Sequence, residues 1–458
     1  MRVARKTQPG LTESWLDLGH AKELQAISGL LDEHPTIQEL VLQDLRVAAG
    51  SEQAATGAGG MSAEQVLRAL LLKQMNRFSY RQLAYHLADS RTYRTFCRLG
   101  ITDPVPKKSA LARNIKALRP ETLETIHRIV LGAAEEHGIE KGRKVRIDAT
   151  VVGSPIHHPT DSELLWDCVR KLTDLMRRAR ALLGSQHISF SNRTRRAKRR
   201  RMEILNAQHK PERRKSAYRD LLLVTEQVCS TALGVHDRLL SPPAELDLLD
   251  ELATQGLAAE IDHFVALSRR VIDQTRRRVV EGESVPAEEK IVSIFEEHTD
   301  IIRKDGRDTY YGHKVYLTVG ASSMVLDCEV VRGNPADSTR AIKMIDRQTE
   351  IYGRPPRQAT FDGAFSSKVN LETIKKSGVE DVAFSKGRGL DVSDMVRSLW
   401  VYRRLRHFRA GVEGVISFLK RVFGLRRCTL RSWHSFQSYV WSSMLTCNLL
   451  IFARHLIA

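Results

Sequence analysis

Apolar and polar residues alternate along residues 144–152, where every second position from Val145 to Val151 is apolar. A period of two is typical of a β-strand, and it places Asp148 on the face opposite the apolar side chains. Asp is disfavoured in the middle of a strand. The position of Asp148 therefore calls for a functional or a hydrogen-bonding explanation.

Later parts of the chain repeat the strand pattern. Residues 313–320 and 324–331 alternate in the same way on either side of a short polar turn, which predicts a β-hairpin. Shorter strands are predicted at residues 357–361 and 379–384, and the first of them leads directly into Asp362-Gly363. Ligand-binding groups in α/β sheets are typically presented at the carboxyl ends of strands, where Asp362 lies.

Helical spacing characterises the region before the first strand. Ser62 is a good N-cap for a helix, with Gln65 at the capping-box position. Further short helices are predicted at residues 80–87, 109–118 and 120–137. The third of these four helices carries or follows Lys107, Lys108, Arg113 and Lys116. Short helices with basic residues are typical of a helix-turn-helix-like DNA-binding unit, and an ordinary helical bundle is the alternative.

The segment 157–290 is predicted to be helical and very polar, and it contains a dense basic run. Seven of the nine positions from 193 to 201 are cationic: Arg193, Arg195, Arg196, Lys198, Arg199, Arg200 and Arg201. Such a block repels itself unless an anion neutralises it. We expect these side chains to contact the phosphate backbone of DNA, and a solvated helix face is the alternative.

The remaining elements complete a mixed α/β pattern. Asp337 or Ser338 is expected to cap a helix that runs to residue 351, and a helix over 368–377 is expected to stop at Gly378. A last helix before the C-terminal segment covers 406–423. The predicted regions are an N-terminal segment and linker (1–60), a helical DNA-binding domain (61–138), a catalytic domain (139–156 and 291–425), a helical basic insertion (157–290) and a C-terminal helical segment (426–458).

Composition narrows the class of protein. The chain has 458 residues, a net charge of +18 and 42% hydrophobic residues, which favours a globular protein with a polyanionic partner, most commonly nucleic acid. None of the six cysteines forms a C-x-x-C pair, so we expect neither a zinc site nor a disulfide framework. No signal peptide is evident, and we interpret the apolar residues 436–457 as a buried helix rather than a membrane span. These features predict a cytoplasmic protein.

Three carboxylates could meet in this fold. Asp148 and Asp362 lie on neighbouring predicted strands, and Glu413 lies on a helix with Arg409 four residues before it and Lys420 seven residues after it. Three like charges at one site repel one another unless a cation lies among them. Hard divalent ions fit this ligand set, so we predict two Mg²⁺ or Mn²⁺ ions, with no small-molecule cofactor. A structural Asp and a surface ion pair are the alternatives for the single residues.

With these residues the chain resembles the bacterial insertion-sequence transposases of the DDE type. Their signature is Tyr, two residues, Arg, three residues, Glu, six residues, Lys, and Arg409, Glu413 and Lys420 match it, whereas Arg406 occupies the Tyr position. Asp148-Ala-Thr150 and Asp362-Gly363 are similar to the family's two Asp motifs. Further similar segments are Arg68-Ala-Leu-Leu-Leu-Lys73, Ser79-Tyr-Arg-Gln-Leu-Ala84, Tyr311-Gly-His-Lys-Val315 and Gly333-Asn-Pro-Ala-Asp-Ser338. Within the family the resemblance is closest to the group called ISNCY.

The resemblance implies an RNase H-like core, a mixed five-stranded sheet with flanking helices, interrupted after its first strand by the helical insertion. It implies metal-dependent cleavage at the ends of an insertion sequence and attack of the 3′-hydroxyl on target DNA, with Asp148, Asp362 and Glu413 as catalytic metal ligands. Arg406, Arg409 and Lys420 would contact DNA, and the active complex would contain a homodimer bound to double-stranded DNA. An RNase H-like nuclease without strand transfer, a catalytically inactive DNA-binding repressor and an RNA-binding protein are the alternatives.

Overall fold

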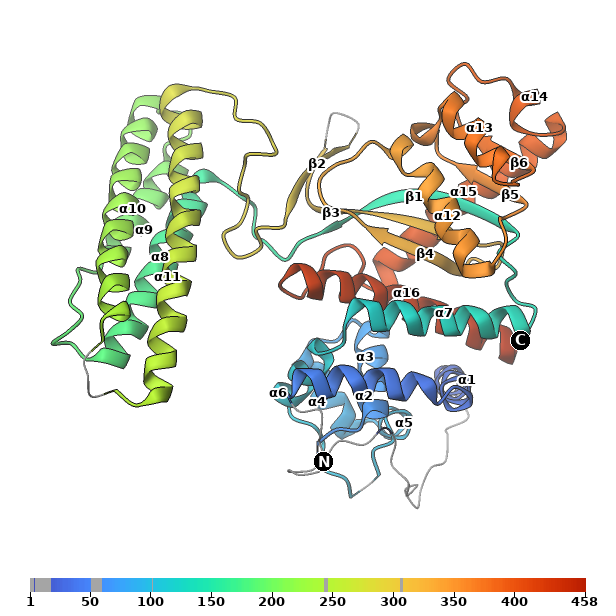
Figure 1. Ribbon diagram of the computed structural model, residues 1–458, viewed down its shortest axis with the longest axis horizontal. Coiled ribbons are helices and arrows are strands. Elements are labelled where there is room, and N and C mark those ends of the chain that lie inside the picture. Colours follow the sequence, from blue (N-terminus) through green and yellow to red (C-terminus); the bar gives the residue numbers. More distant parts are fainter. Residues whose placement is uncertain (1–3, 5–17, 51–59, 101, 243–245, 305–307) are drawn as a thin grey trace. The chain divides into compact units, whose positions relative to one another are not determined.

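The computed structural model describes residue 4 and residues 18–50, 60–100, 102–242, 246–304 and 308–458. The chain forms two compact units, of which the first combines Met1–Pro155 with Gly312–Ala458 and the second is Ile156–Tyr311 (Figure 1). The first unit therefore contains the N-terminal helices, most of the sheet and the C-terminal helices. The second unit extends past residue 290, where the sequence pattern placed the end of the insertion.

A mixed β-sheet organises the first unit. Its strands are β1 (Lys144–Gly153), β3 (Asp308–Val319), β4 (Val325–Val330), β5 (Gln358–Phe361) and β6 (Asp381–Phe384). Strand β3 is antiparallel to β1 and β4, whereas β5 runs parallel to β1 and β6 runs parallel to β5. The predicted hairpin and the predicted order of these five strands are confirmed.

The predicted number of strands is wrong. Within the described residues the sheet has six strands, because β2 (Asp300–Lys304) lies next to β3. This strand contains only two apolar residues, Ile301 and Ile302, and they are adjacent. A pair of adjacent apolar residues shows neither the alternation nor the length by which a strand is recognised in a sequence.

Helices cover the sheet and set its loops. They are α12 (Ala341–Tyr352), α13 (Lys368–Lys376), α14 (Val392–Met395), α15 (Leu399–Val422) and α16 (Trp433–Ile457). The end of α13 is as predicted, since Gly378 follows its C-cap with a φ of 101°. The predicted cap of α12 is wrong: a short 3-10 turn over Asp337–Thr339 precedes the helix, and the residue at its N-cap is Arg340. The Asp337 carboxylate instead accepts hydrogen bonds from two residues of β3.

The N-terminal helices begin earlier than the sequence pattern indicated. They are α1 (Gly19–Glu33), α2 (Thr36–Ala48), α3 (Ala63–Met75), α4 (Tyr80–Asp89), α5 (Arg91–Phe96), α6 (Lys108–Lys116) and α7 (Pro120–Glu136). The capping box of Ser62 and Gln65 at the start of α3 is confirmed. Helices α1 and α2 were not predicted, and most of the predicted linker, residues 51–59, lies outside the described residues.

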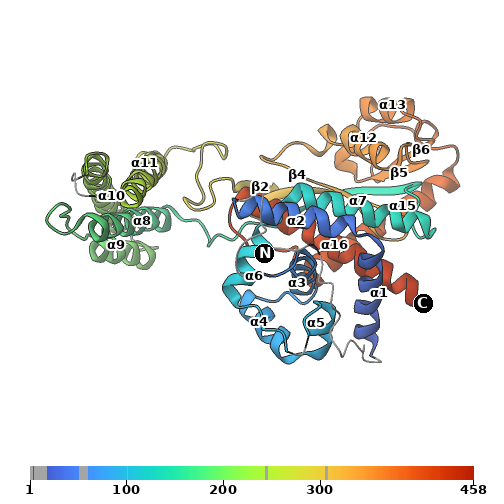
Figure 2. The ribbon, with the colours of Figure 1, turned by 60° about the horizontal axis from the view of Figure 1, so that its bottom comes forward.

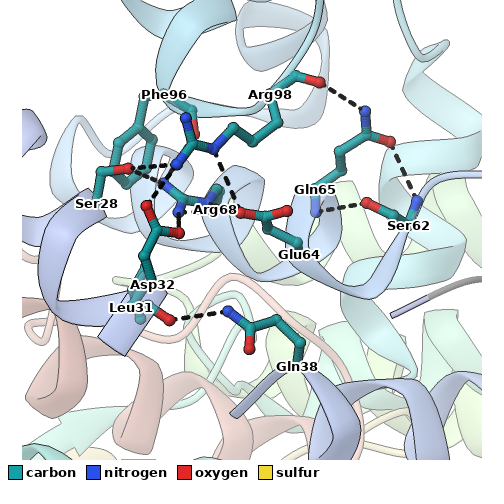
Figure 3. Close-up of polar contacts among 10 residues, drawn as sticks. All are labelled: Ser28, Leu31, Asp32, Gln38, Ser62, Glu64, Gln65, Arg68, Phe96 and Arg98. Carbon is teal, nitrogen blue, oxygen red and sulfur yellow. Dashed lines mark hydrogen bonds and ion pairs between the residues drawn. The ribbon is translucent and has the colours of Figure 1, made fainter. Parts of the chain in front are cut away.

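A buried ion cluster joins three of these helices. Arg68 on α3 is fully buried, and its guanidinium donates to Glu64, to Ser28 and Asp32 on α1, and to the carbonyl of Phe96 (Figure 3). Arg98 reaches the same two carboxylates from the end of α5. Burial lowers the pKa of Arg68, and the Glu64 carboxylate opposes this shift. Removing one partner of such a cluster leaves an uncompensated buried charge.

Helix α16 is the C-terminal helix that the sequence predicted to be buried. Among the described residues it is the one helix long and apolar enough to span a membrane, but 72% of its most apolar stretch is buried inside the protein. It lies beside α7 and contacts β4 (Figures 1 and 2). Asn448 of α16 accepts from the Val325 amide, donates to its carbonyl, and bonds to buried His127 of α7. These contacts indicate a core helix.

The second unit is a helical bundle with its own apolar core. It consists of α8 (Asp161–Leu183), α9 (Thr194–Asn206), α10 (Pro211–Leu240) and α11 (Leu248–Thr275), followed by a π-helical turn over Arg276–Glu281. Helix α10 packs against α8, α9 and α11 (Figures 1 and 2). The prediction that this polar insertion is helical is therefore confirmed.

Candidate active site

Three carboxylates that are distant in sequence converge on one guanidinium. The Nη2 atom of Arg409 lies 3.0 Å from Asp148 Oδ2 and 3.4 Å from Asp362 Oδ1. Its Nη1 atom lies 3.1 Å from Glu413 Oε1. Strand β1, the end of strand β5 and helix α15 thus bring together the three carboxylates that the sequence singled out.

In this arrangement Arg409 takes the central position. Among the residues that the structure describes, no three His, Cys, Asp or Glu side chains lie close enough together to hold a metal ion as they stand. The donor set nevertheless suits a hard divalent cation, because it consists of carboxylate oxygens that share one positive charge. Glu413, whose side chain is 69% exposed, has room to change its rotamer. The residues therefore fit a metal-binding role once Arg409 gives up its central place.

The β1 strand presents Asp148 to helix α15. Arg146, two residues earlier on the same face of the strand, donates from Nη1 to the carbonyl of Phe408 on α15. The predicted division of β1 into an apolar and a polar face is only partly right, since Arg146 and Thr150 are also buried. Helix α15 covers that face, so polar residues with partners on α15 are enclosed there. Asp148 itself is 14% exposed.

Ser385, which the sequence analysis missed, holds Asp362 in place. Its hydroxyl donates to Asp362 Oδ1 at 2.8 Å and accepts from the amide of Gly363, also at 2.8 Å. A Cβ at Gly363 would lie 2.8 Å from the Cβ of Lys386, so a side chain at this position would force the two loops apart. Ser385 follows the last residue of β6, and its position at a strand end was the available signal.

Helix α15 presents Glu413, Arg409 and Lys420 from positions four and seven residues apart. Lys420 is half-buried and Arg406 is exposed. The guanidinium carbon of Arg406 lies 5.9 Å from the ring centre of Tyr402, one turn earlier on the helix. The hydroxyl of Tyr402 donates to the carbonyl of Phe384 at the end of β6. A tyrosine is therefore present at position 402, one turn before the Tyr position of the family signature, and its hydrogen bond anchors α15 to the sheet.

Two further motifs from the sequence meet next to the Asp362 loop. Lys314 of β3 forms an ion pair with Asp337 at 2.9 Å, and the hydroxyl of Tyr316 donates to the same carboxylate. The turn containing Asp337 contacts the turn that follows Asp362. Asn370 of α13 ties the two turns together by donating to the carbonyls of Ser338 and Phe365. These contacts fix the loop that carries the second Asp.

The basic run lies on α9 in the second unit, and the structure separates it into two faces. Arg196 and Arg200 both bind Asp220 of α10, and Arg200 also binds Glu203. Arg201 binds Glu163 of α8. The anions that neutralise these three residues are therefore acids of this chain, which lie outside the basic run itself. The exposed cations Arg195, Lys198 and Arg199 have no acidic partner within the described residues.

Two family models match the chain. A transposase domain, the family described as DUF772, matches residues 13–117, and a transposase DDE domain matches residues 267–449. The first match includes α1 and α2, so the N-terminal transposase domain begins earlier than predicted. The second match contains Asp362 and Glu413 but begins after Asp148, which the helical insertion separates from them. No curated protein and no solved structure gives a significant match.

Proposed function

We propose that this chain, which carries the two transposase domains just described, is a DDE transposase that cuts DNA at the ends of an insertion sequence and joins the ends to target DNA. The observation that supports this proposal best is the convergence of Asp148, Asp362 and Glu413 on Arg409. The strand order β4-β3-β1-β5-β6 supports an RNase H-like core. The placement within the ISNCY group and the homodimeric active complex stay predictions.

Asp148, Asp362 and Glu413 are the residues that would hold Mg²⁺ or Mn²⁺. Two such ions, when bound, would activate a water or the 3′-hydroxyl of a DNA end as the nucleophile and would stabilise the leaving oxygen of the phosphodiester. Ser385 keeps one oxygen of Asp362 in a fixed direction, so the other oxygen is the one available as a ligand. The Ala149 amide likewise donates to Asp148 Oδ1, which leaves Oδ2 directed at the centre of the site.

Arg409 has two roles in this proposal. Without bound ions it offsets the repulsion among the three carboxylates and keeps them near one another. With ions and DNA in place, its planar guanidinium is suited to bind two oxygens of a phosphate. Lys420 lies eleven residues, or about three turns, further along the same helix and would hold another phosphate of the same DNA. The chain's own cations thus bind and orient the DNA at the carboxylates.

The test is a set of isosteric substitutions in the full-length chain. Asp148→Asn, Asp362→Asn and Glu413→Gln remove one ligand each and keep the side-chain shape, so each is expected to abolish cleavage of element-end DNA in Mg²⁺ while binding persists. Glu372→Gln on the exposed side of α13 is the matched control. Near-normal cleavage by any one of the three variants would remove that residue from the metal site.

The products of the same assay separate the alternatives. A labelled 3′-hydroxyl end that becomes joined to a second duplex identifies a transposase. Cleavage without joined product identifies a nuclease. Sequence-specific binding with neither reaction, in Mg²⁺ and in Mn²⁺, identifies a repressor that has lost catalysis.

A further inference from the structure

A cavity of about 630 Å³ lies in the first unit, away from the three carboxylates. It is lined by the end of α3, the turn into α4, and the segment after α15 from Gly424 to Leu430. Its lining includes Lys73, Arg77, Arg426 and Arg427. Among the described residues, no Asp or Glu lines it. A concave surface with this charge selects an anion.

Lys73 is the feature that distinguishes this cavity from an ordinary basic surface. Its side chain is only 7% exposed, and burial lowers its pKa. The ammonium lies 5.0 Å from the ring centre of Tyr80, and within the described part of the chain no carboxylate pairs with it. Charged groups are seldom buried without a partner because desolvation is costly. A buried ammonium without a carboxylate partner, on a residue that lines a cavity, suits a site that receives its counter-charge from a ligand.

The walls of the cavity are held in place by hydrogen bonds. Gln74, the neighbour of Lys73, donates to the carbonyl of Phe423 and to the hydroxyl of Ser443. The hydroxyl of Tyr439 donates to the carbonyl of Gly424 at 2.9 Å. Gly424 has a φ of 71°, and a Cβ there would lie 2.6 Å from the Tyr439 hydroxyl oxygen, so glycine is required at this turn. The cavity is therefore preformed.

The distance between the cavity and the candidate active site can be estimated along two elements that join them. The Cys428 amide donates to the carbonyl of Gly153 at the end of β1, five residues after Asp148, which corresponds to about 17 Å of strand. Along α15 the nine residues from Glu413 to the end of the helix at Val422 correspond to about 14 Å, and Gly424 follows two residues later. One DNA strand advances about 3.4 Å per nucleotide, so both routes correspond to about five nucleotides.

We propose that this cavity binds a backbone phosphate of the DNA substrate, about five nucleotides from the phosphate that reacts, with Lys73 as its buried cation and Arg426 at its rim. The DNA as ligand rests on the proposed function, whereas the preference for a phosphate rests on the cavity itself. The cavity is lined by Lys73 of the Arg68–Lys73 motif and by Ser79, Tyr80 and Gln82 of the Ser79–Ala84 motif, so it assigns a function to these residues. A contact to the phosphate carries no base specificity, so the cavity contributes affinity and register.

The experiment compares full-length wild type with Lys73→Met and with Lys141→Met, a matched loss of charge at the opposite end of β1. Binding to a 30-base-pair duplex is measured without divalent ions over a range of salt concentrations. Lys73→Met is expected to weaken binding about tenfold at low salt, since a charge-assisted contact is lost. The slope of log affinity against log salt is expected to fall by about 0.9, while Lys141→Met matches wild type.

Equal affinities and slopes for wild type and Lys73→Met would overturn the proposal. If Lys73→Met does not fold, as judged by circular dichroism, Arg426→Gln decides in the same way, because Arg426 is exposed. Inorganic phosphate and thymidine monophosphate are tested by thermal shift at constant ionic strength. Lys73-dependent stabilisation by either one, with duplex binding unchanged in Lys73→Met, would assign the cavity to a free phosphate and overturn the DNA ligand. If the protein does not cleave DNA but its DNA binding depends on Lys73, the proposal for the cavity stands and the proposed function is refuted.

Discussion

Replacing Arg195, Lys198 and Arg199 by alanine removes three exposed cations from one face of α9. The matched variant replaces Arg196, Arg200 and Arg201, which removes the same charge from the faces that bind acids of α8, α10 and α9 itself. Both variants leave the candidate active site untouched. The structure predicts that the two variants affect different properties, DNA affinity in the first and stability in the second.

The expected change in the salt dependence of DNA binding follows from the number of cations without an acidic partner. Each phosphate contact contributes about 0.9 to the slope of log affinity against log salt, so loss of three contacts lowers the slope by up to about 2.7. Exposed substitutions change the free energy of unfolding by no more than about 0.5 kcal/mol, so the melting temperature of the first variant is expected to stay near wild type. The second variant leaves Asp220 and Glu163 without their arginine partners and is expected to melt lower, with a nearly unchanged salt slope.

Fluorescence anisotropy with labelled duplexes of unrelated sequence gives the slopes, and differential scanning fluorimetry gives the melting temperatures. Because phosphate contacts carry no base information, the loss is expected to be equal for all duplexes. Identical slopes for wild type and the first variant would show that the exposed face of α9 is solvated surface. A larger decrease of the salt slope in the second variant than in the first would refute the assignment of the exposed cations to DNA binding.

Three further predictions concern stability. Arg68→Met is expected to cost about 3 kcal/mol in chemical denaturation, because it leaves the buried Glu64 carboxylate with only the longer contact from Arg98. Arg128→Met removes an exposed i,i+4 pair worth no more than about 1 kcal/mol. Equal losses of stability in the two variants would refute this difference. Burial lowers the pKa of His127 to about 4, whereas the unfolded chain binds this proton near pH 6.5. The free energy of unfolding is therefore expected to fall by about 3 kcal/mol as the pH falls from 6.5 to 4. His127→Gln is expected to remove this part of the pH dependence, and an unchanged pH profile would exclude His127 as its source. Gly312→Ala would place a Cβ 2.0 Å from the Val152 carbonyl oxygen and is expected to destabilise the protein by about 3 kcal/mol or more. Gly132→Ala on α7 places its Cβ in open space and is expected to stabilise the protein by about 1 kcal/mol. The opposite order of melting temperatures would contradict this geometry.

The strands of the sheet could be predicted where alternation was long enough. Strands β1, β3 and β4 each contain six residues or more, and their periods are evident in the sequence. Strand β2 has only two adjacent apolar residues, and its place in the sheet depends on β3 beside it. Helices α1 and α2 were not predicted, although their apolar residues recur at helical spacing and are buried.

The candidate site was predictable in its carboxylates and not in what surrounds them. Asp148 is unusual because it lies within an apolar strand, and Asp362 directly follows the end of another strand. Their positions in the sequence were therefore enough to identify them as candidates. The central position of Arg409 depends on the angle at which α15 crosses β1, and the spacing of residues along the helix does not predict that angle. Ser385 acts on Asp362 through a contact between adjacent strand ends. The acids that bind Arg196 and Arg201 likewise come from other helices.

The insertion has a consequence for the order in which the enzyme is made. Gly153 and Gly312 are partners in the sheet, so the chain returns to β3 beside the point where it left β1. The helical bundle between them is rich in local contacts and can fold while the rest is still being synthesised. Asp362 follows Asp148 by 214 residues, which takes roughly 10–40 s at the usual speed of translation. Until α15 has been made, the nascent chain has at most two of the three carboxylates, so the proposed metal site cannot assemble before this helix is synthesised.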